Sequence, residues 1–426
     1  MGSVLRQSLN FNMAVFRTVL FWTHLVTGVV AGVVILIMSV TGVLLTYEKQ
    51  MLEWADRSQP GLASSDDFAP ILPPEGLVAA AAAAVPEARP TGLTVRADAG
   101  APATVTFDGG RSLLVDPRTA ANLGEPSSRL RGFFRAVTSW HRVLALEGTS
   151  RATGKAITGA ANLAFLFIVL SGLYLWIPRV WSRLQFTQVL WFRGGLSPKA
   201  RDFNWHNVIG IWSAVPLAIV VAGAVPISYS WAGNLVYRMA GETPPEPPPQ
   251  AARPGGPARP GGPGAPGPGG GGRERRNDGG GEPRAVDLSG LDAAWAAAQA
   301  QVPAWRTMSV RFAGPPAGPP AGPLVISVDE GYGGQPQLRS TLSIDRASGS
   351  VVKAETFDDL GPGRRARSWL RFAHTGEFYG LTGQTIAGLV SAGGAVLVYT
   401  GIVLAQRRLW AWLRRRAQRT DASQAA

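Results

Sequence analysis

The sequence predicts a membrane protein whose all-α core has four transmembrane helices, arranged as a two-fold internal duplication, with two small α+β domains facing outward. Three observations predict this fold class. Four long stretches contain no Asp, Glu, Lys or Arg. Two of the segments between them alternate apolar and polar residues, as β-strands do. Similar motifs also recur in the same order in both halves of the chain.

The charge-free stretches define the helices. Only 16% of the 426 residues are charged, whereas an ordinary soluble domain carries about 25%. The stretches lie between Arg17 and Glu48, Lys155 and Arg179, Asp202 and Arg238, and Glu377 and Arg407. Each exceeds the roughly 20 residues that span about 30 Å of hydrocarbon. We therefore predict transmembrane helices at 18–47, 156–177, 205–237 and 381–405.

Basic residues in the short loops predict the orientation. The loop at 178–204 carries five Lys and Arg residues, and the tail at 406–426 carries six Arg residues. Because basic short loops stay in the cytoplasm, we expect both termini, including segment 1–17, to be cytoplasmic. The net charge of +13 is then mostly a topology signal, and nucleic acid is not an expected partner.

The two outward segments, 48–128 and 285–363, are each predicted to form a helix packed on a small β-sheet. In the first, the Ala-rich stretch EGLVAAAAAAVPEA precedes the alternating runs GLTVRADA, ATVTFD and RSLLVDPRTAANLG. In the second, LSGLDAAWAAAQAQV precedes TMSVRF, GPLVISVDE and LRSTLSIDRASGSVV. The Pro- and Gly-rich stretch at 242–284 cannot build a core and is predicted to be a disordered linker.

An Arg-rich amphipathic helix is predicted after each outward segment, at 129–146 and 364–380. Its apolar face suits it to lie on the outer membrane surface. The motif TGKAITG at 153–159 returns as TGQTIAG at 382–388, and HLVTG in the first helix returns as HNVIG in the third. These repeats predict that each half contains a spanning helix, an outward domain, a surface helix and a second spanning helix.

The chain has only four histidines, in matching places of the two halves. His24 and His206 lie near the cytoplasmic face, and His141 and His374 near the outer face. A slab about 30 Å thick separates the pairs, so one four-histidine site is excluded. Two imidazoles are too few for a tight zinc or copper site. Two trans imidazoles do suffice for haem b, whose porphyrin supplies four nitrogens.

We therefore predict two bis-histidine haem b groups, with these four histidines as axial ligands of the iron. The chain lacks cysteine, which excludes disulfides, iron–sulfur clusters and thiolate-bound haem. Gly28 and Gly210 follow His24 and His206 by one helical turn and would clear the face of a haem. Simple helix packing is the alternative reading of these glycines, and hydrogen bonding between helices is the alternative for a membrane histidine.

Arginines flank the outer histidines. Arg142 and Arg371 are the expected partners of haem propionates, because guanidinium pairs with carboxylates in a bidentate manner. Arg364, Arg365 and Arg367 are expected to form an electropositive surface that attracts an anionic electron acceptor. Anchoring to anionic lipid headgroups is the competing explanation, since both helices are amphipathic.

Several of these motifs resemble a known family. LLVDPRTAANLG and LSIDRASGSVV resemble the strand–turn–strand of PepSY modules. WHRVLAL and AHTGEFYGLTGQTIAG resemble motifs of the PepSY-associated transmembrane family, especially its bacterial siderophore-iron reductase and iron-uptake members. The similarity covers nearly the whole chain except the linker. It implies PepSY-like periplasmic domains, a bacterial inner-membrane location and the same four histidine ligands.

The resemblance also implies an oxidoreductase that passes electrons through two haems to a periplasmic ferric siderophore or other ferric chelate, releasing Fe(II) for uptake. No G-x-G-x-x-G motif follows a strand, so a membrane quinol or a cytoplasmic reductase must supply the electrons. Two alternatives remain open. One is a membrane-anchored PepSY regulatory or binding module, and the other is a quinol-dependent cytochrome that donates to another protein.

Overall fold

The computed structural model describes residues 2–62, 70–98, 100–177, 187, 189–246, 286–312 and 322–424. They form two compact units. Unit 1 comprises Met1–Thr46, Ala136–Gly233 and Ala373–Ala426, and unit 2 comprises Tyr47–Arg135 and Asn234–Phe372. The linker predicted at 242–284 lies outside the described residues from position 247 onward.

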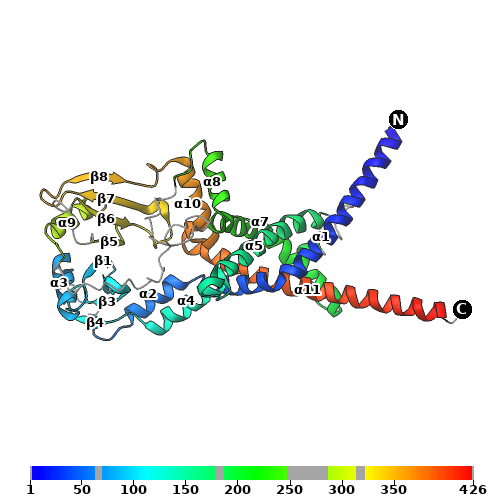
Figure 1. Ribbon diagram of the computed structural model, residues 1–426, viewed down its shortest axis with the longest axis horizontal. Coiled ribbons are helices and arrows are strands. Elements are labelled where there is room, and N and C mark those ends of the chain that lie inside the picture. The colour runs from blue at the N-terminus through cyan, green and yellow to red at the C-terminus, as the bar shows by residue number, and fades with distance from the viewer. Residues whose placement is uncertain are drawn as a thin grey trace. The chain divides into compact units, whose positions relative to one another are not determined.

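Unit 1 is built on four long helices: α1 (Gly2–Leu45), α5 (Arg151–Trp176), α7 (Pro198–Ser228) and α11 (Gly380–Gln424). The four helices run alongside one another (Figure 1). Both α1 and α7 pack against α5 and α11, so α1 and α7 occupy diagonal corners of the bundle. All four contain stretches long and apolar enough to cross a membrane, which confirms the prediction of four helices of this kind.

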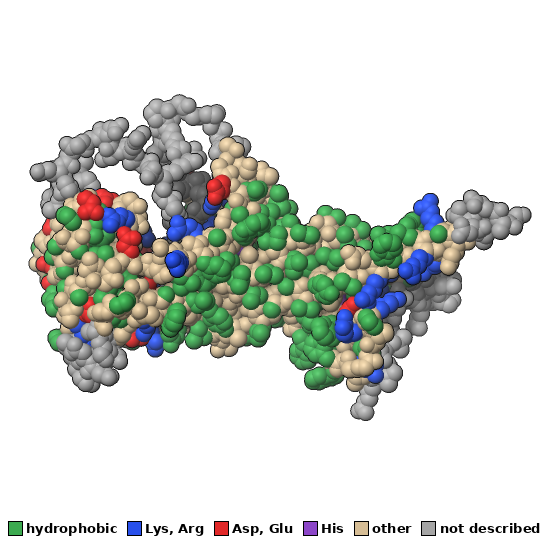
Figure 2. Space-filling model, turned by 90° about the horizontal axis from the view of Figure 1, so that it is seen from below, with side chains coloured by type: hydrophobic (Ala, Val, Ile, Leu, Met, Phe, Trp, Pro, Cys, Tyr) green, Lys and Arg blue, Asp and Glu red, His purple; other side chains and the backbone are tan. Residues whose placement is uncertain are grey.

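The outer surface of the bundle is apolar. Val30 is 77% exposed, Leu389 67% and Val215 65%, and Figure 2 shows hydrophobic side chains all along these helices. A water-soluble protein rarely exposes such a large continuous apolar surface. The four apolar helices therefore indicate a membrane protein.

The helix ends differ in part from the predicted ranges. The third span was predicted to run to 237, but α7 ends at Ser228 and a separate helix α8 (Ser230–Met239) follows. Tyr229 between them has extended backbone dihedrals. Pro226 cannot donate a backbone hydrogen bond, so the last turn of α7 is weakened at this point. At the other end of the chain, α11 continues through the basic tail to Gln424.

Two amphipathic helices, α4 (Ser128–Val143) and α10 (Pro362–Thr375), carry the predicted surface segments and end in left-handed turns. After α4, the left-handed residues are Leu144 and Ala145, and after α10 it is Gly376. Each turn then packs against a glycine of the next long helix, and neither glycine has room for a side chain. These are Gly154 and Gly383, the equivalent glycines of TGKAITG and TGQTIAG.

The last glycines of the same two motifs also have equivalent neighbours. A Cβ at Gly159 of α5 would lie 2.9 Å from the hydroxyl of Tyr229, which follows α7. A Cβ at Gly388 of α11 would lie 2.8 Å from Oγ1 of Thr46, which follows α1. Each motif thus lets a long helix approach the end of an adjacent helix closely. The short helices α2 (Glu48–Arg57), η2 (Gly148–Ser150) and η4 (Glu377–Tyr379) complete the connections.

Unit 2 contains one antiparallel sheet of eight strands in the order β4-β3-β2-β1-β5-β6-β7-β8. The strands are β1 (Pro90–Arg96), β2 (Ala103–Phe107), β3 (Ser112–Val115), β4 (Asn122–Gly124), β5 (Thr307–Arg311), β6 (Leu324–Asp329), β7 (Arg339–Ile344) and β8 (Val351–Glu355). The two outward segments were expected to form separate domains. Instead β1 pairs with β5, from Gly92↔Arg311 to Arg96↔Thr307, and joins them into one sheet. The 3₁₀ turns η1 (Asp108–Gly110) and η3 (Pro336–Leu338) lie between strands.

Two helices, α3 (Pro74–Ala84) and α9 (Leu291–Gln301), pack on the same hydrophobic core as the sheet. Alternate strand residues such as Leu93, Ile326 and Leu342 contribute to this core, as the period of two requires. The N-termini of the helices stabilise each other: the Glu75 N–H donates to Oδ1 of Asp292 at 2.8 Å, and the Asp292 N–H donates to Oε1 of Glu75 at 3.3 Å. Each carboxylate thereby caps the other helix.

The two strand–turn–strand motifs have the same local structure. Oδ1 of Asp116 accepts hydrogen bonds from the N–H groups of Arg118 and Thr119, and Oδ1 of Asp345 accepts them from Ala347 and Ser348. The fifth residue of each turn is left-handed: Ala120 has φ 59° and Gly349 has φ 66°. The aspartates therefore act as side-chain turn formers in the two segments that resemble the strand–turn–strand of PepSY modules.

Candidate functional site

All four histidines lie in unit 1, and each is held through Nδ1. His24 on α1 contacts the Ser171 hydroxyl of α5 at 2.9 Å. Ser171 also donates to the carbonyl of Ile168, so its single proton is already used. The Nδ1–H of His24 is therefore the donor to Ser171. A Cβ at the next residue, Gly172, would lie 3.2 Å from Cε1 of His24, so this glycine makes room for the ring.

His206 on α7 repeats this arrangement with α11. Its Nδ1 lies 2.9 Å from Oγ1 of Thr400, and Thr400 donates its own proton to the carbonyl of Val396. A Cβ at Gly401 would lie 3.4 Å from Cε1 of His206. In both cases a hydroxyl residue hydrogen-bonds to the histidine, and the glycine that follows it leaves room for the imidazole ring. The two imidazoles are also close enough to interact electrostatically.

The other two histidines come from the amphipathic helices. Nδ1 of His141 on α4 lies 2.9 Å from Oγ1 of Thr41 on α1, and Thr41 donates to the carbonyl of Ile37. Nδ1 of His374 on α10 lies 2.8 Å from the carbonyl of Val220 on α7. The ring centroids of His141 and His374 are 6.2 Å apart, with an angle of 43° between the ring planes.

The Nδ1 contacts select one tautomer in every case. A hydroxyl whose proton is used elsewhere, or a carbonyl, can only accept from Nδ1–H, which leaves the lone pair on Nε2. No residue in the described part of the chain hydrogen-bonds to any of the four Nε2 atoms. Metal-binding histidines typically have this arrangement, with the second nitrogen held by an outer partner.

The His141 and His374 rings are also neutral at physiological pH. Desolvation inside the bundle, assisted by the nearby His374, lowers the pKa of His141 to about 4. Desolvation lowers the pKa of His374 as well. The Nε2 lone pair of each ring is therefore available near pH 7. All four side chains nevertheless keep some accessible surface.

The His24–His206 pair and the His141–His374 pair lie at different levels of the bundle. Thr41, which holds His141, follows His24 by 17 residues of α1, a rise of about 25 Å. Val220, which holds His374, follows His206 by 14 residues of α7, a rise of about 21 Å. The structure thus brings the histidines together two by two and separates the two pairs. No cluster of three or more His, Cys, Asp or Glu able to hold a metal ion occurs among the described residues.

The predicted glycines have different surroundings. A Cβ at Gly28 would meet nothing within 4 Å, and one at Gly210 would meet only Cδ2 of Leu397 at 3.7 Å. Space therefore lies open beside Gly28, and the protein itself does not fill it. The glycines that lie beside the imidazoles are instead Gly172, Gly401 and Gly42, where a Cβ would lie 3.2 Å, 3.4 Å and 3.7 Å from Cε1 of His24, His206 and His141.

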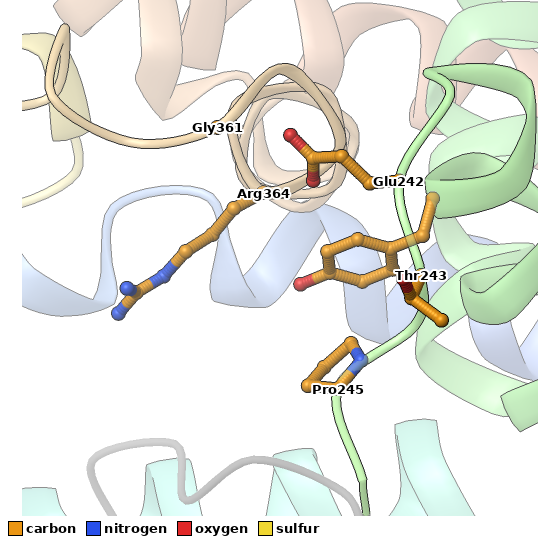
Figure 3. Close-up of a pocket in the computed structure, with 6 residues that line it drawn as sticks. Glu242, Thr243, Pro245, Gly361 and Arg364 are labelled. Atoms are coloured by element: carbon orange, nitrogen blue, oxygen red, sulfur yellow. The ribbon is translucent and has the colours of Figure 1, made fainter.

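The predicted arginines are mostly solvent-accessible. Arg142 is exposed, and Arg371 lies 5.4 Å over the ring of Phe372. Arg365 is 3.7 Å from Asp358. Arg364 lines a cavity of about 540 Å³ in unit 2 with Tyr237, Glu242, Thr243, Pro245 and Gly361. In Figure 3 the Arg364 guanidinium points away from the Glu242 carboxylate.

Sequence reasoning did not identify the partners of the histidines, namely Ser171, Thr400, Thr41 and Val220. Three of them share a signal that was available. Each is a hydroxyl residue followed by glycine inside an otherwise apolar run: Ser171–Gly172, Thr400–Gly401 and Thr41–Gly42. Val220 carries no such signal, because it uses its backbone carbonyl.

Comparison with known proteins gives one match. The model of a family described as the PepSY-associated TM region matches residues 21–408. No curated protein matches the chain significantly. The matched region contains all four histidines, all of α5 and α7, and most of the apolar parts of α1 and α11. The chain therefore belongs to the family of PepSY-associated transmembrane proteins.

Proposed function

We propose that this protein is a membrane oxidoreductase that carries two haem b groups and reduces ferric siderophores or other ferric chelates on the outer side of a bacterial inner membrane. The proposal includes cytoplasmic termini, an origin of the two halves by duplication, and PepSY-like periplasmic segments. Fe(III) binds hard oxygen ligands strongly, and reduction to Fe(II) weakens that binding and permits release for uptake.

The spacing of His141 and His374 is the observation that carries this proposal. A metal–nitrogen bond of about 2.0 Å places an imidazole centroid roughly 3 Å from the metal, so two trans imidazoles have centroids roughly 6 Å apart. The observed centroids are 6.2 Å apart. Both rings also keep Nε2 without a hydrogen-bond partner among the described residues. His141 and His374 would therefore be able to hold one haem iron between them.

We propose that His24 and His206 hold a second haem, because their Nδ1 atoms are held in the same way as those of the first pair. Ser171 and Thr400 accept from the Nδ1–H groups and direct the Nε2 lone pairs to the remaining side of each ring. When bound, haem would accept and release single electrons. The hydrogen bonds to Nδ1 orient the imidazole rings and set their tautomers. The apolar helices around both histidine pairs exclude water from them.

An electron path through the protein then needs a donor and an acceptor. The two histidine pairs are separated by about 20–25 Å along the helices, and this separation suits electron transfer from one membrane face to the other. A membrane quinol or a cytoplasmic reductase would supply the electrons. The solvent-accessible arginines of α10 favour an anionic ferric chelate as acceptor.

Absorbance spectroscopy of the purified protein tests the proposal. We expect a Soret band that shifts when dithionite is added, and a return to the oxidised spectrum when a ferric chelate is added. Iron released as Fe(II) should be trapped by a ferrous chelator in proportion to the chelate consumed. A colourless protein from haem-replete cells would exclude the proposal. That result would favour the membrane-anchored regulatory module.

A red protein that reacts with no ferric chelate would support the presence of haem but exclude the ferric-chelate reductase activity. That outcome would favour a quinol-dependent cytochrome with a protein acceptor. A panel of acceptors of different charge, mixed with pre-reduced protein in a stopped-flow instrument, separates these two cases. A fast phase with at least one chelate is the result that the proposal expects.

A further inference from the structure

An ion triad around a buried carboxylate lies one helical turn from His206. Asp202, only 3% exposed, precedes His206 by four residues on α7. Its Oδ1 accepts from Arg201 at 3.0 Å, and its Oδ2 accepts from Nη2 of Arg407 on α11 at 2.8 Å. Both carboxylate oxygens are thereby occupied, and the three groups together carry one positive charge.

The second terminal nitrogen of Arg407 has no such partner. Nη1 is buried and makes no hydrogen bond within the described part of the chain. The Arg407 side chain as a whole is 35% exposed, but a buried guanidinium N–H without an acceptor is costly. An acceptor of negative charge would satisfy both the N–H and the charge.

Neighbouring arginines in this region already have partners. Arg408 lies 4.9 Å over the rings of both Phe21 and Trp22. Arg201 is paired with Asp202 and lies 5.7 Å over Trp205. Arg17 donates to the carbonyl of Leu175. Arg407 therefore differs from these three in having a buried nitrogen to spare.

We propose that Arg407 binds a propionate carboxylate of the haem held by His24 and His206, with Asp202 orienting the guanidinium. This inference rests on the proposed function and assigns a further binding residue to it. Arg407 follows Thr400 by seven residues on α11, so two helical turns, or about 10 Å, separate it from the residue that holds His206. Guanidinium presents paired N–H groups that match a carboxylate.

Haem transfer to apomyoglobin tests this assignment without measuring enzyme activity. We compare the wild type with Arg407→Gln and with Arg408→Gln as the matched neighbour. Loss of one charge-assisted hydrogen bond corresponds to about a tenfold faster release. Arg407→Gln should speed the release of one haem by about this factor, and Arg408→Gln should leave both rates unchanged. Equal rates in the two variants would overturn the inference.

Two backgrounds show which haem is affected. In His141→Ala, where only the His24–His206 haem should remain, Arg407→Gln should still accelerate release. In His206→Ala the same substitution should have no effect. An effect on the His141–His374 haem instead would refute the assignment. Absence of any haem in the wild type would refute the proposed function, whereas two haems with no effect of Arg407→Gln would refute this inference alone.

Asp202→Asn separates direct binding from a merely structural role. If Arg407 acts only through its ion pair with α7, Asp202→Asn should reproduce the whole effect, and adding Arg407→Gln should change nothing more. If Arg407 binds the carboxylate, Arg407→Gln should remain effective in the Asp202→Asn background.

Haem whose propionates are blocked supplies the matching test on the ligand. Loading with the dimethyl ester of haem should abolish the difference in release rate between the wild type and Arg407→Gln, because the ester has no carboxylate to bind. A persisting difference contradicts carboxylate binding. Loss of bound anionic lipid from Arg407→Gln, with unchanged haem release, would overturn the inference and assign Nη1 to a lipid phosphate instead.

Discussion

At the scale of single residues, the hydroxyl groups around the histidines are as informative as the histidines. Ser171, Thr400 and Thr41 each donate their proton to a carbonyl of their own helix and accept from an imidazole Nδ1–H. This double use favours the tautomer with the proton on Nδ1. It also fixes the direction in which each Nε2 lone pair points.

Removing one of these hydroxyls should loosen one haem. We expect Thr400→Ala to lower the affinity of the His206 site by about tenfold, as loss of an outer partner typically does. Thr385→Ala is the matched control, because Thr385 is on the same helix, is exposed, and donates to the carbonyl of Leu381 within that helix. Haem content after dialysis against apomyoglobin measures the effect. Equal haem loss from both variants would show that the Thr400 hydroxyl does not support the ligand.

The open space at Gly28 gives a second prediction. A Leu side chain there meets no protein atom near its Cβ, so it should be accepted by the fold. If a haem occupies that space, Gly28→Leu should lower the haem content from two to one per chain while the protein stays folded and monodisperse. Val30→Leu, two residues away and 77% exposed, serves as control. Two haems in Gly28→Leu would show that Gly28 does not face the cofactor.

At the scale of elements, the described helices follow their sequence signals more closely than the sheet does. Charge-free runs are long, local and unambiguous, and they predicted all four spans. The pairing of β1 with β5 joins residues more than 200 positions apart, and a local pattern cannot specify such a pairing. The ends of α4 and α7 were also misplaced. Left-handed Leu144 and Ala145 are not glycines, and Pro226 near the end of α7 gave no clear signal, because Pro216 lies inside the same helix without ending it.

The turn between β7 and β8 should make the sheet sensitive to acid. The backbone N–H of Ser348, and then its hydroxyl, hold the pKa of Asp345 below its ordinary value of 3.8. Since the folded pKa is the lower one, the stabilisation is present above the unfolded pKa and is lost as the pH falls through the folded pKa. Thermal unfolding followed by circular dichroism should therefore show a steeper loss of stability below pH 3.8 in the wild type than in Asp345→Asn.

Asp358→Asn is the control for this experiment. The Asp358 carboxylate is 91% exposed and lies 3.7 Å from Arg365, a contact too open to contribute much. Its pH profile should follow that of the wild type. If Asp345→Asn also followed the wild type, the hydrogen bonds of the turn would contribute nothing to the acid sensitivity of the sheet.

At the scale of the whole molecule, charge on α10 should influence the choice of acceptor. Arg364 is exposed, and Arg365 has only the distant Asp358 as an ionic partner in the described residues. Replacing Arg364, Arg365 and Arg367 together by Gln should slow reoxidation by a negatively charged ferric chelate about tenfold at low ionic strength. The salt dependence of that rate should become weaker, because fewer positive charges remain on α10 for the dissolved ions to screen. A positively charged chelate is the internal control, and equal slowing of both would leave only a membrane-anchoring role.

The candidate site was predictable in part for the same physical reason as the helices. Four histidines in apolar runs stand out in a sequence, and their grouping followed from their distance from the loop charges. Their supporting atoms could not be found in this way, since a Thr or Ser in a helix usually bonds only its own backbone. The carbonyl of Val220 has no sequence signal at all, because every residue has one.

The most direct test of the whole account is the number of haems in single histidine variants. Pyridine haemochromogen assays and protein quantitation on the purified wild type should give two haems per chain. His24→Ala and His206→Ala should each give one haem, with the same remaining spectrum, and His141→Ala and His374→Ala should each give one haem with the other spectrum. Asn207→Ala, beside His206, should keep both. Loss of both haems from one substitution, or retention of both in all four variants, would contradict the pairing of His24 with His206 and of His141 with His374.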